Sequence, residues 1–310
     1  MKFYIGVTDN NWYKHLSSIK PDEVNFWQPG GKAFKALSPN DLFLFKLHLP
    51  FNYIVGGGFF IRHSLLPVSL AWEAFGEKNG TKEYSTFLNT ILKYKHTDRK
   101  QEPDPQIGCI ILGSPFFFKE SDWIPVPKNW SSNIVKGKSY NTDSMDGYDL
   151  YQEVIEKIGL LREDNSDIAG FVNESENRYG TAQLVYPRLG QGAFRVIVTE
   201  AYQRRCAITG EKTLPVLDAA HIRSFSQDGP NTANNGLLLR NDMHTLFDKG
   251  YITINENMQI EVSKRIKEDY GNGKEYYAFH GKKLIILPNN DGDKPSREFI
   301  RWHNENVYVS

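Results

Sequence analysis

The N-terminal half of the chain alternates short apolar runs with turn residues. Residues 41–48, 52–61 and 107–112 are rich in aromatic and β-branched side chains, which is typical of strands. A Leu-Pro-Phe bend separates the first two runs, and a Ser-Pro-Asn-Asp turn precedes them. Residues 123–127 have the proline content of an edge strand. The pattern predicts a β-rich N-terminal domain.

An acidic stretch follows this β-rich part. Residues 147–161 have a helical pattern, and the sequence then becomes rich in Glu, Asp, Asn and Ser. Residues 143–178 hold 3 Lys and Arg against 10 Asp and Glu, which gives a charge of −7. Because this composition is typical of a connector, we expect two domains, 1–165 and 166–310.

The C-terminal part changes its periodicity over a short distance. Residues 214–222 form an apolar run that predicts a strand, and residues 224–235 are dense in Ser, Asn, Asp, Gly and Pro, which predicts a loop. A second short strand is expected at 237–240. Residues 241–249 then predict a helix that Asn241 caps and that ends before a glycine.

Candidate metal ligands lie on this short helix. His244 and Asp248 are four residues apart, so they project from one face, as two ligands of a single ion must. His221 lies at the end of the first predicted strand, 214–222. Strand, loop, strand and short helix with these side chains is the arrangement of a ββα-metal hairpin.

These residues resemble the HNH endonuclease family. The relevant branch reads Cys-Ala-Ile-Thr-Gly, Ala-Ala-His-Ile, Asn-Gly-Leu-Leu-Leu-Arg and His-x-Leu-Phe-Asp, and this chain carries the four motifs from Cys206, Ala219, Asn235 and His244. The resemblance covers about residues 186–310. It implies hydrolysis of DNA phosphodiesters that leaves 5′-phosphate and 3′-hydroxyl ends.

The resemblance also implies a role for each site residue. His221 would be the general base that deprotonates the attacking water. Asn235 would pin the loop against the strand and thereby orient His221. His244 and Asp248 would hold a divalent ion that binds the scissile phosphate and stabilises the leaving 3′ oxygen. One imidazole and one carboxylate suit Mg²⁺ or Mn²⁺ with several waters, although other transition ions are compatible.

One position departs from the family pattern. Many members carry a metal-binding His, Asp or Glu immediately before the base, where this chain has Ala220. Asp218 is the nearest carboxylate, but alternation along a strand would turn it away from His221 unless a bulge intervenes. Asp218 is therefore either a third ligand or a carboxylate that caps the strand end or the loop.

Cysteine content and hydropathy limit the class of protein. The two cysteines, Cys109 and Cys206, are too few for a zinc knuckle or a disulfide framework, so we expect Cys206 to be a small buried residue. No apolar run is as long as a membrane span, and the N-terminus lacks the apolar core of a signal peptide. These features predict a cytoplasmic protein with no membrane partner.

The charge distribution is compatible with double-stranded DNA as the partner. Residues 1–142 hold 17 Lys and Arg against 12 Asp and Glu (+5), and residues 179–310 hold 17 against 15 (+2). Arg195 and Arg223 are candidates for contacts with the DNA backbone, or are simply solvated. Because one metal hairpin cuts one strand, cleavage of both strands predicts a homodimer or two encounters.

The N-terminal pattern resembles the small β-barrels of the PUA superfamily, which includes the SRA and EVE readers of modified bases. That resemblance implies a flipped base held between aromatic rings, for which Trp27 and Phe26 are candidates. Core packing is the other interpretation of Trp27. Gly56, Gly57 and Gly58 either let the DNA approach the backbone or mark a bulge or close packing.

Together, the patterns predict an α+β protein with a PUA-like β-barrel reader followed by a ββα-metal HNH nuclease. This combination resembles type IV, modification-dependent restriction enzymes that act in defence against phage and other foreign DNA. Two alternatives remain open. The chain could be a restriction nuclease that reads an unmodified sequence, or a DNA-binding protein whose nuclease site has decayed, as Ala220 suggests.

Overall fold

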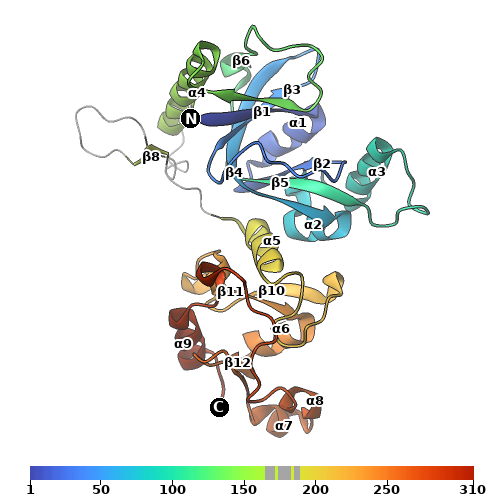
Figure 1. The fold of residues 1–310 in the computed structure, drawn as a ribbon, viewed down its shortest axis with the longest axis vertical. Helices are drawn as coiled ribbons and strands as arrows, with labels where there is room; N and C mark the ends of the chain where they lie inside the picture. Colours follow the sequence, from blue (N-terminus) through green and yellow to red (C-terminus); the bar gives the residue numbers. More distant parts are fainter. Residues whose placement is uncertain (165–171, 174–182, 185–188) are drawn as a thin grey trace. The chain divides into compact units, whose positions relative to one another are not determined.

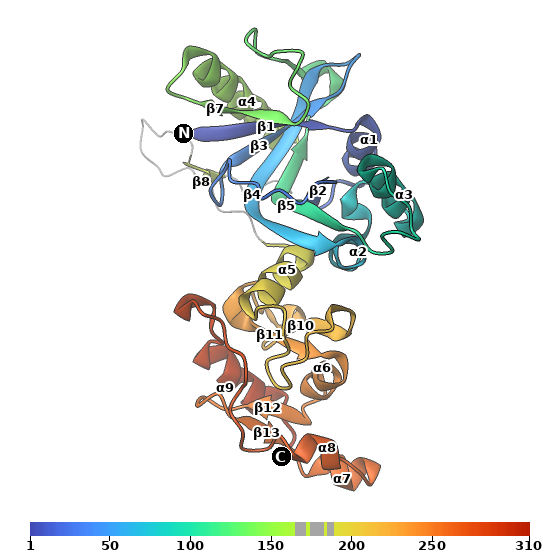
Figure 2. The same cartoon turned by 45° about the vertical axis from the view of Figure 1, so that its right-hand side comes forward.

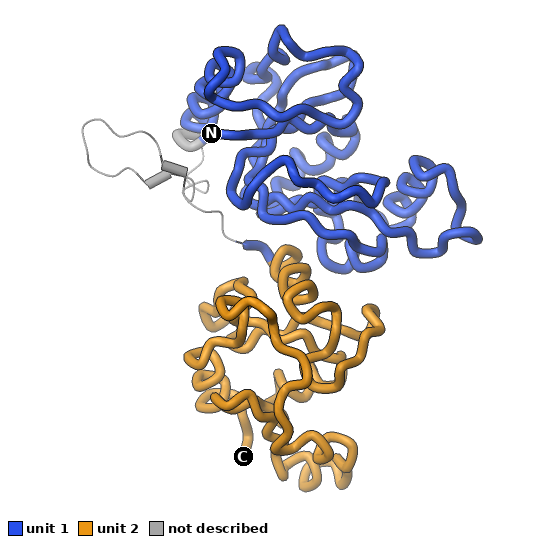
Figure 3. Tube along the Cα trace, in the orientation of Figure 1, with its two compact units in different colours: residues 1–190 blue, residues 191–310 orange. Residues whose placement is uncertain are grey.

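The chain divides into two compact units. The computed structural model describes residues 1–164, 172–173, 183–184 and 189–310. The units are Met1–Gly190 and Gln191–Ser310 (Figure 3). The expected boundary at residues 165/166 lies outside the described residues.

Unit 1 is built on one mixed sheet of seven strands (Figure 1). The strand order is β2-β5-β4-β3-β1-β7, and β6 pairs with β4. β1 and β3 are parallel, and the other neighbours are antiparallel. The strands are β1 (Lys2–Thr8), β2 (Glu23–Gln28), β3 (Leu42–Leu47), β4 (Tyr53–Pro67), β5 (Gln106–Phe117), β6 (Ile124–Pro125) and β7 (Gly137–Asn141).

The predicted strands at 41–48, 52–61, 107–112 and 123–127 correspond to β3, β4, β5 and β6. A closed barrel is not confirmed, because the pairing among described residues runs from β2 to β7 without joining these two ends. The chain has the expected mixture of helices and strands. β4 and β5 are long strands whose mutual register shifts twice, between Gly57 and Phe59 and between Phe60 and Arg62.

Both faces of the sheet are apolar because alternate residues of each buried strand point to opposite sides. Phe3 and Leu42 join Val154 in the core beneath α4, whereas Tyr4 and Phe43 belong to the core beneath α1 (Figure 2). The helices of this unit are α1 (Asn10–Ile19), α2 (Val68–Phe75), α3 (Tyr84–Lys95) and α4 (Met145–Asp164). A short strand pair, β8 (Val172–Asn173) and β9 (Gln183–Leu184), follows α4.

The glycine triplet lies where β4 meets its neighbours. A Cβ on Gly56 would overlap the carbonyl oxygen of Phe116, and one on Gly57 would lie 2.6 Å from the carbonyl oxygen of Phe43. These contacts favour close strand packing as the reason for the glycines.

Unit 2 contains the predicted strand, loop, strand and helix. Residues far apart in the sequence, including Tyr202, Leu238, Phe247 and Ile300, meet in one core. The elements are α5 (Gln191–Ala201), β10 (Leu217–His221), β11 (Gly236–Arg240), α6 (Asn241–Asp248), β12 (Ile252–Ile254), β13 (Ile260–Val262), α7 (Arg265–Tyr270), α8 (Lys274–Tyr277) and α9 (Arg297–Asn306).

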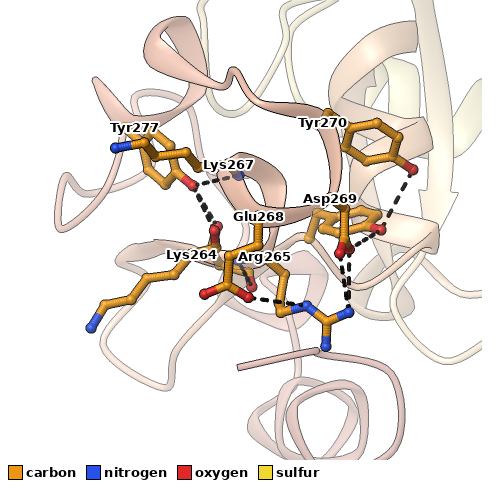
Figure 4. A network of polar contacts seen from close by, with 9 residues as sticks. Lys264, Arg265, Lys267, Glu268, Asp269, Tyr270 and Tyr277 are labelled. Atoms are coloured by element: carbon orange, nitrogen blue, oxygen red, sulfur yellow. Dashed lines mark hydrogen bonds and ion pairs between the residues drawn. The ribbon is translucent and has the colours of Figure 1, made fainter.

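A polar network fixes α7 and α8 at one end of this unit (Figure 4). Asp269 accepts hydrogen bonds from Tyr251 Oη at 2.9 Å and from Arg265 Nη2 at 3.1 Å. Tyr277 Oη lies 3.1 Å from the carbonyl oxygen of Ser263. Tyr276 of α8 then reaches Asp242 of α6, with 3.4 Å between its Oη and Oδ2. α8 therefore supports the helix that carries His244.

Candidate active site

The candidate site is formed where β10, the following loop and α6 meet. β10 and β11 pair without a register shift from Leu217 opposite Arg240 to His221 opposite Gly236. α6 begins at Asn241, directly after β11, and Arg240 rather than Asn241 is the capping residue. β10, the loop, α6 and α9 line a cavity of about 600 Å³, whose lining includes His221, Ser224, His244, Asp248, Trp302 and Asn306.

His221 is a half-buried imidazole with two well-defined neighbours. Its Nε2 lies 2.8 Å from Oδ1 of Asn231. Its ring stacks on that of Phe194 from α5, with 3.8 Å between the centroids and 11° between the planes. Burial lowers the pKa of His221, and the hydrogen bond with Asn231 only partly opposes this effect. The imidazole is therefore neutral at pH 7 and able to accept a proton.

Asn235 holds the loop that follows His221. It is fully buried, and its side chain makes three hydrogen bonds. Oδ1 accepts from the backbone N of Arg223 at 2.9 Å, and Nδ2 donates to the carbonyl oxygens of Arg223 and Pro230, each at 2.9 Å. One side chain thereby ties both ends of the loop at residues 223–230 to β11.

His244 lies between two carboxylates. Its Nδ1 is 3.2 Å from Oδ2 of Asp218, and its Nε2 is 3.2 Å from Oδ2 of Asp248. Burial lowers the pKa of His244, but the hydrogen bonds to Asp218 and Asp248 outweigh burial and raise it to about 9. When no ion is bound, these contacts favour the protonated ring, and an ion at Nε2 would displace the proton there.

Asp218 approaches His244 from the side away from the cavity. Ala219 and His221 line the cavity, whereas Asp218 does not, as strand alternation requires. Its Oδ1 lies 3.4 Å from Nη1 of Arg195. Burial raises the pKa of Asp218, but the contacts with His244 and Arg195 outweigh burial and lower it. Asp218 therefore reaches the site without the bulge that the sequence argument required.

The two arginines expected near DNA both have contacts within the protein. Arg195 pairs with Asp218, as described above. Arg223 Nε donates to the carbonyl oxygen of Gln227 at 2.7 Å, and its guanidinium lies 5.6 Å from the centroid of the Trp302 ring. Gln227 and Trp302 line the same cavity as His221, and Arg223 contacts both of them without lining it.

The position before His221 faces the core. Ala220 is fully buried among the apolar residues of unit 2, whereas the flanking Ala219 and His221 line the cavity. The alanine at this position is therefore explained by core packing.

A second cavity, of about 280 Å³, lies in unit 1. Its lining includes Trp12, Phe26, Trp27, Gln28 and Tyr94, so aromatic rings form much of its wall. Phe26 is only 7% exposed and contacts the core residues of its sheet, whereas Trp27 is half-buried. The indole Nε1 of Trp27 donates to the carbonyl oxygen of Asn79 at 3.1 Å, which fixes the ring.

Comparison with known proteins agrees with the geometry of unit 2. Residues 206–255 match the model of the HNH endonuclease family. These residues form an HNH endonuclease domain. The match includes His221, Asn235, His244 and Asp248 and extends through β12. The chain is therefore a nuclease enzyme.

Other comparisons add little to this assignment. One similar solved structure is a modification-dependent TagI restriction endonuclease, with 13% identity, 93% of this chain and 78% of that chain covered, and a TM-score of 0.28. A likeness at this TM-score supports no conclusion about function. No curated protein matches the chain. Within the described parts of the chain, no helix has the length and apolar content of a membrane span.

The HNH domain offers a pair of side chains that fits a divalent ion. Cis ligands about 2.1 Å from an octahedral ion lie roughly 3 Å apart, and His244 Nε2 and Asp248 Oδ2 are 3.2 Å apart and line the cavity together. Among the residues that the structure describes, no three His, Cys, Asp or Glu side chains converge on one metal position. The pair suits an ion that keeps several waters or substrate oxygens as further ligands.

Sequence reasoning overlooked three neighbours of the HNH site. Asn231 and Phe194 contact His221, and Trp302 lines the cavity from α9. Asn231 belongs to a loop in which several Asn residues look equivalent, so spacing alone could not single it out. Cys206 is buried, as expected, and its Sγ accepts from the backbone N of Arg240 at 3.3 Å.

Proposed function

We propose that the chain is a metal-dependent DNA endonuclease of the restriction type, in which His221 activates the attacking water. The observation that carries this proposal is the pairing of a neutral His221 with His244 and Asp248 in one cavity. A general base must be unprotonated near neutral pH and lie within reach of the reacting phosphate. Burial supplies the first condition, and the shared cavity supports the second.

The other site residues divide the remaining work. His244, through Nε2, and Asp248 would hold the ion, and Asp218 would keep Nδ1 of His244 protonated and its ring oriented. When bound, a divalent ion supplies charge stabilisation at the scissile phosphate and at the leaving oxygen. Asn235 keeps the loop in place so that His221 faces the phosphate.

Double-stranded DNA is the proposed substrate. Arg223 contacts Gln227 and Trp302, which line the cavity, and we propose that its guanidinium contacts a backbone phosphate next to the cut. Arg195 contributes through Asp218 and therefore acts on the site from within the protein. Because the chain has one HNH domain, cutting both strands requires two copies or two encounters.

For unit 1, we propose recognition of a modified base in the cavity beside Trp27. Aromatic walls and the polar edge of Gln28 are the kind of surface that stacks a planar base and reads its edge. Trp27 is the proposed stacking residue because it is half-buried and its ring is fixed by Asn79. Phe26 contributes an apolar wall from the core. Recognition of an unmodified sequence is the alternative for this cavity.

The decisive experiment compares cleavage of matched plasmid and phage DNAs that are unmodified, cytosine-methylated, hydroxymethylated or glucosylated, with Mg²⁺ or Mn²⁺. We expect cleavage that requires the ion and is abolished in His221→Ala. Binding of DNA with no cleavage by the wild type under any condition would instead establish the decayed-site alternative.

The reader is tested with the same DNAs. Trp27→Ala should remove the preference for a modified substrate while leaving cleavage of a short unmodified duplex at high enzyme concentration unchanged. Trp72→Ala is the matched control, because Trp72 is also half-buried and contacts Tyr84 and Phe87 away from the cavity lining. Equal cleavage of all four DNAs by the wild type would refute modified-base recognition and leave the nuclease proposal intact.

A further inference from the structure

The hydrogen bond between His221 and Asn231 determines where the imidazole carries its proton. The contact joins Nε2 to the side-chain oxygen of Asn231 at 2.8 Å. An amide oxygen only accepts hydrogen bonds, so the contact is a hydrogen bond only when Nε2 carries the hydrogen. In the neutral ring the lone pair is then on Nδ1. Among the described residues, Nδ1 of His221 has no hydrogen-bond partner.

We propose that Asn231 is a positioning residue that holds His221 in the tautomer with hydrogen on Nε2, so that Nδ1 is the basic atom. The inference rests on the proposed function of His221 as general base. Nδ1 takes a proton from water as the water oxygen bonds to phosphorus. The bond from phosphorus to the 3′ oxygen breaks, and the released 3′ oxygen gains a proton from solvent.

Asn231 is itself held firmly enough to act in this way. Its side chain is 8% exposed, and the preceding residue, Pro230, accepts a hydrogen bond from Asn235 at 2.9 Å. Asn235 thus fixes the loop on which Asn231 sits. The ring of Phe194 covers one face of the imidazole and restricts its rotation away from Asn231.

The chemistry of the amide explains why this partner is Asn rather than Asp. Two carboxylates lie 3.2 Å from the ring nitrogens of His244, whereas the partner of His221 is a neutral amide. A neutral amide oxygen orients the ring of His221 without adding a negative charge, so the base remains unprotonated near pH 7. The other charged groups that act on His221 are His244, Asp248 and Asp218, and a substitution at Asn231 changes none of them.

Two substitutions separate orientation from charge. Asn231→Asp keeps the acceptor and the size of the side chain, and its negative charge should raise the pKa of His221 by about one unit or more. The acidic limb of the pH profile of DNA nicking should move to higher pH by the same amount. Asn231→Leu removes the acceptor, and we expect the maximal nicking rate to fall about 100-fold, since a misplaced base costs this much.

Asn234 provides the matched controls. It lies three residues further along the same loop, and its side chain accepts from Thr232 at 2.6 Å without lining the cavity. Asn234→Asp and Asn234→Leu should leave the rate and its pH profile unchanged. Hydrogen exchange of the full chain verifies that the loop keeps its structure in every variant.

The tautomer is measured directly on ¹⁵N-labelled full-length protein by long-range ¹H–¹⁵N correlation of the histidine rings. The His221 signals are assigned by their loss in His221→Ala. We expect hydrogen on Nε2 in the wild type and in Asn231→Asp, and a mixture of tautomers in Asn231→Leu. This readout does not depend on cleavage, so it decides the role of Asn231 even if the protein nicks no DNA.

Hydrogen on Nδ1 of neutral His221 in the wild type would overturn the proposal, whatever the nicking rates are. An Asn231→Leu protein with the wild-type tautomer and pH profile would also overturn it. A wild type that nicks no DNA but shows hydrogen on Nε2 would refute the nuclease function alone.

Discussion

Replacing Asn235 with alanine is the substitution whose effect can be worked out most directly from the structure. The change deletes three hydrogen bonds at once, all of them to the backbone at the two ends of one loop. It also leaves a small void, because Asn235 is fully buried. Asn231, whose side chain contacts His221, then loses the anchor of its loop.

The expected cost follows from these contacts. A hydrogen bond contributes about 1 kcal/mol net, and each unpaired buried partner costs about 1–3 kcal/mol more. The backbone groups of Arg223 and Pro230 lie in a half-exposed loop, where water replaces part of the loss. We therefore expect Asn235→Ala to lower the free energy of unfolding of unit 2 by about 2–4 kcal/mol. The nicking rate should fall by about 100-fold or more.

Hydrogen exchange of the full-length protein, followed by mass spectrometry at increasing urea, measures the effect for each unit separately. Protection of the backbone N of Arg223 should be lost first, because it donates directly to Oδ1 of Asn235. Asn234→Ala is the control and should change the unfolding free energy by less than about 0.5 kcal/mol. Equal losses of stability in Asn235→Ala and Asn234→Ala would refute the reasoning.

Three further predictions concern unit 2. Gly250 has φ of 76° and an added Cβ would overlap backbone atoms, whereas Gly281 has φ of 77° and open space, so Gly250→Ala should destabilise unit 2 more than Gly281→Ala in thermal unfolding. Burial lowers the pKa of His303 to about 4. The unfolded imidazole gains its proton below about pH 6.5, whereas the folded one gains it only near pH 4. The free energy of unfolding, measured with urea, should therefore fall by about 3 kcal/mol between pH 6.5 and pH 4, and it should fall by less in His303→Leu. Phe194→Leu should lower the nicking rate without changing its metal requirement, since the stack orients His221 but lines no ion position.

Local sequence predicted unit 2 better than unit 1 for a physical reason. The loop at 224–235 is specified by turn chemistry within a few residues, and the helix that begins at Asn241 by the apolar spacing within it, although its expected Asn241 cap is not formed. Sheet order is different, since β1 pairs with β3 some forty residues away and with β7 near the other end of the unit. No periodicity encodes such pairing, so β1, β7 and the helices α1 and α3 were not predicted.

The same distinction applies to the site. His221, His244 and Asp248 are fixed by the spacing of one hairpin, so the sequence could identify them together. Phe194 stacks on His221 from a helix that precedes β10, and its role depends on tertiary packing. For Asp218, strand alternation predicted correctly that the side chain does not line the cavity with His221. It did not predict the contact with His244, which forms because α6 packs against β10.

The two histidines of the site show how neighbours, rather than residue type, divide the chemistry. His221 contacts an aromatic ring and a neutral amide, so burial governs its pKa and keeps it unprotonated. His244 contacts two carboxylates, which outweigh burial and raise its pKa, so an ion at Nε2 would have to displace a proton. Opposite shifts in one cavity are typical of groups with different catalytic tasks. Because the neighbours set these states, exchanging the amide beside His221 for a carboxylate should raise its pKa toward that of His244 while leaving the hairpin intact.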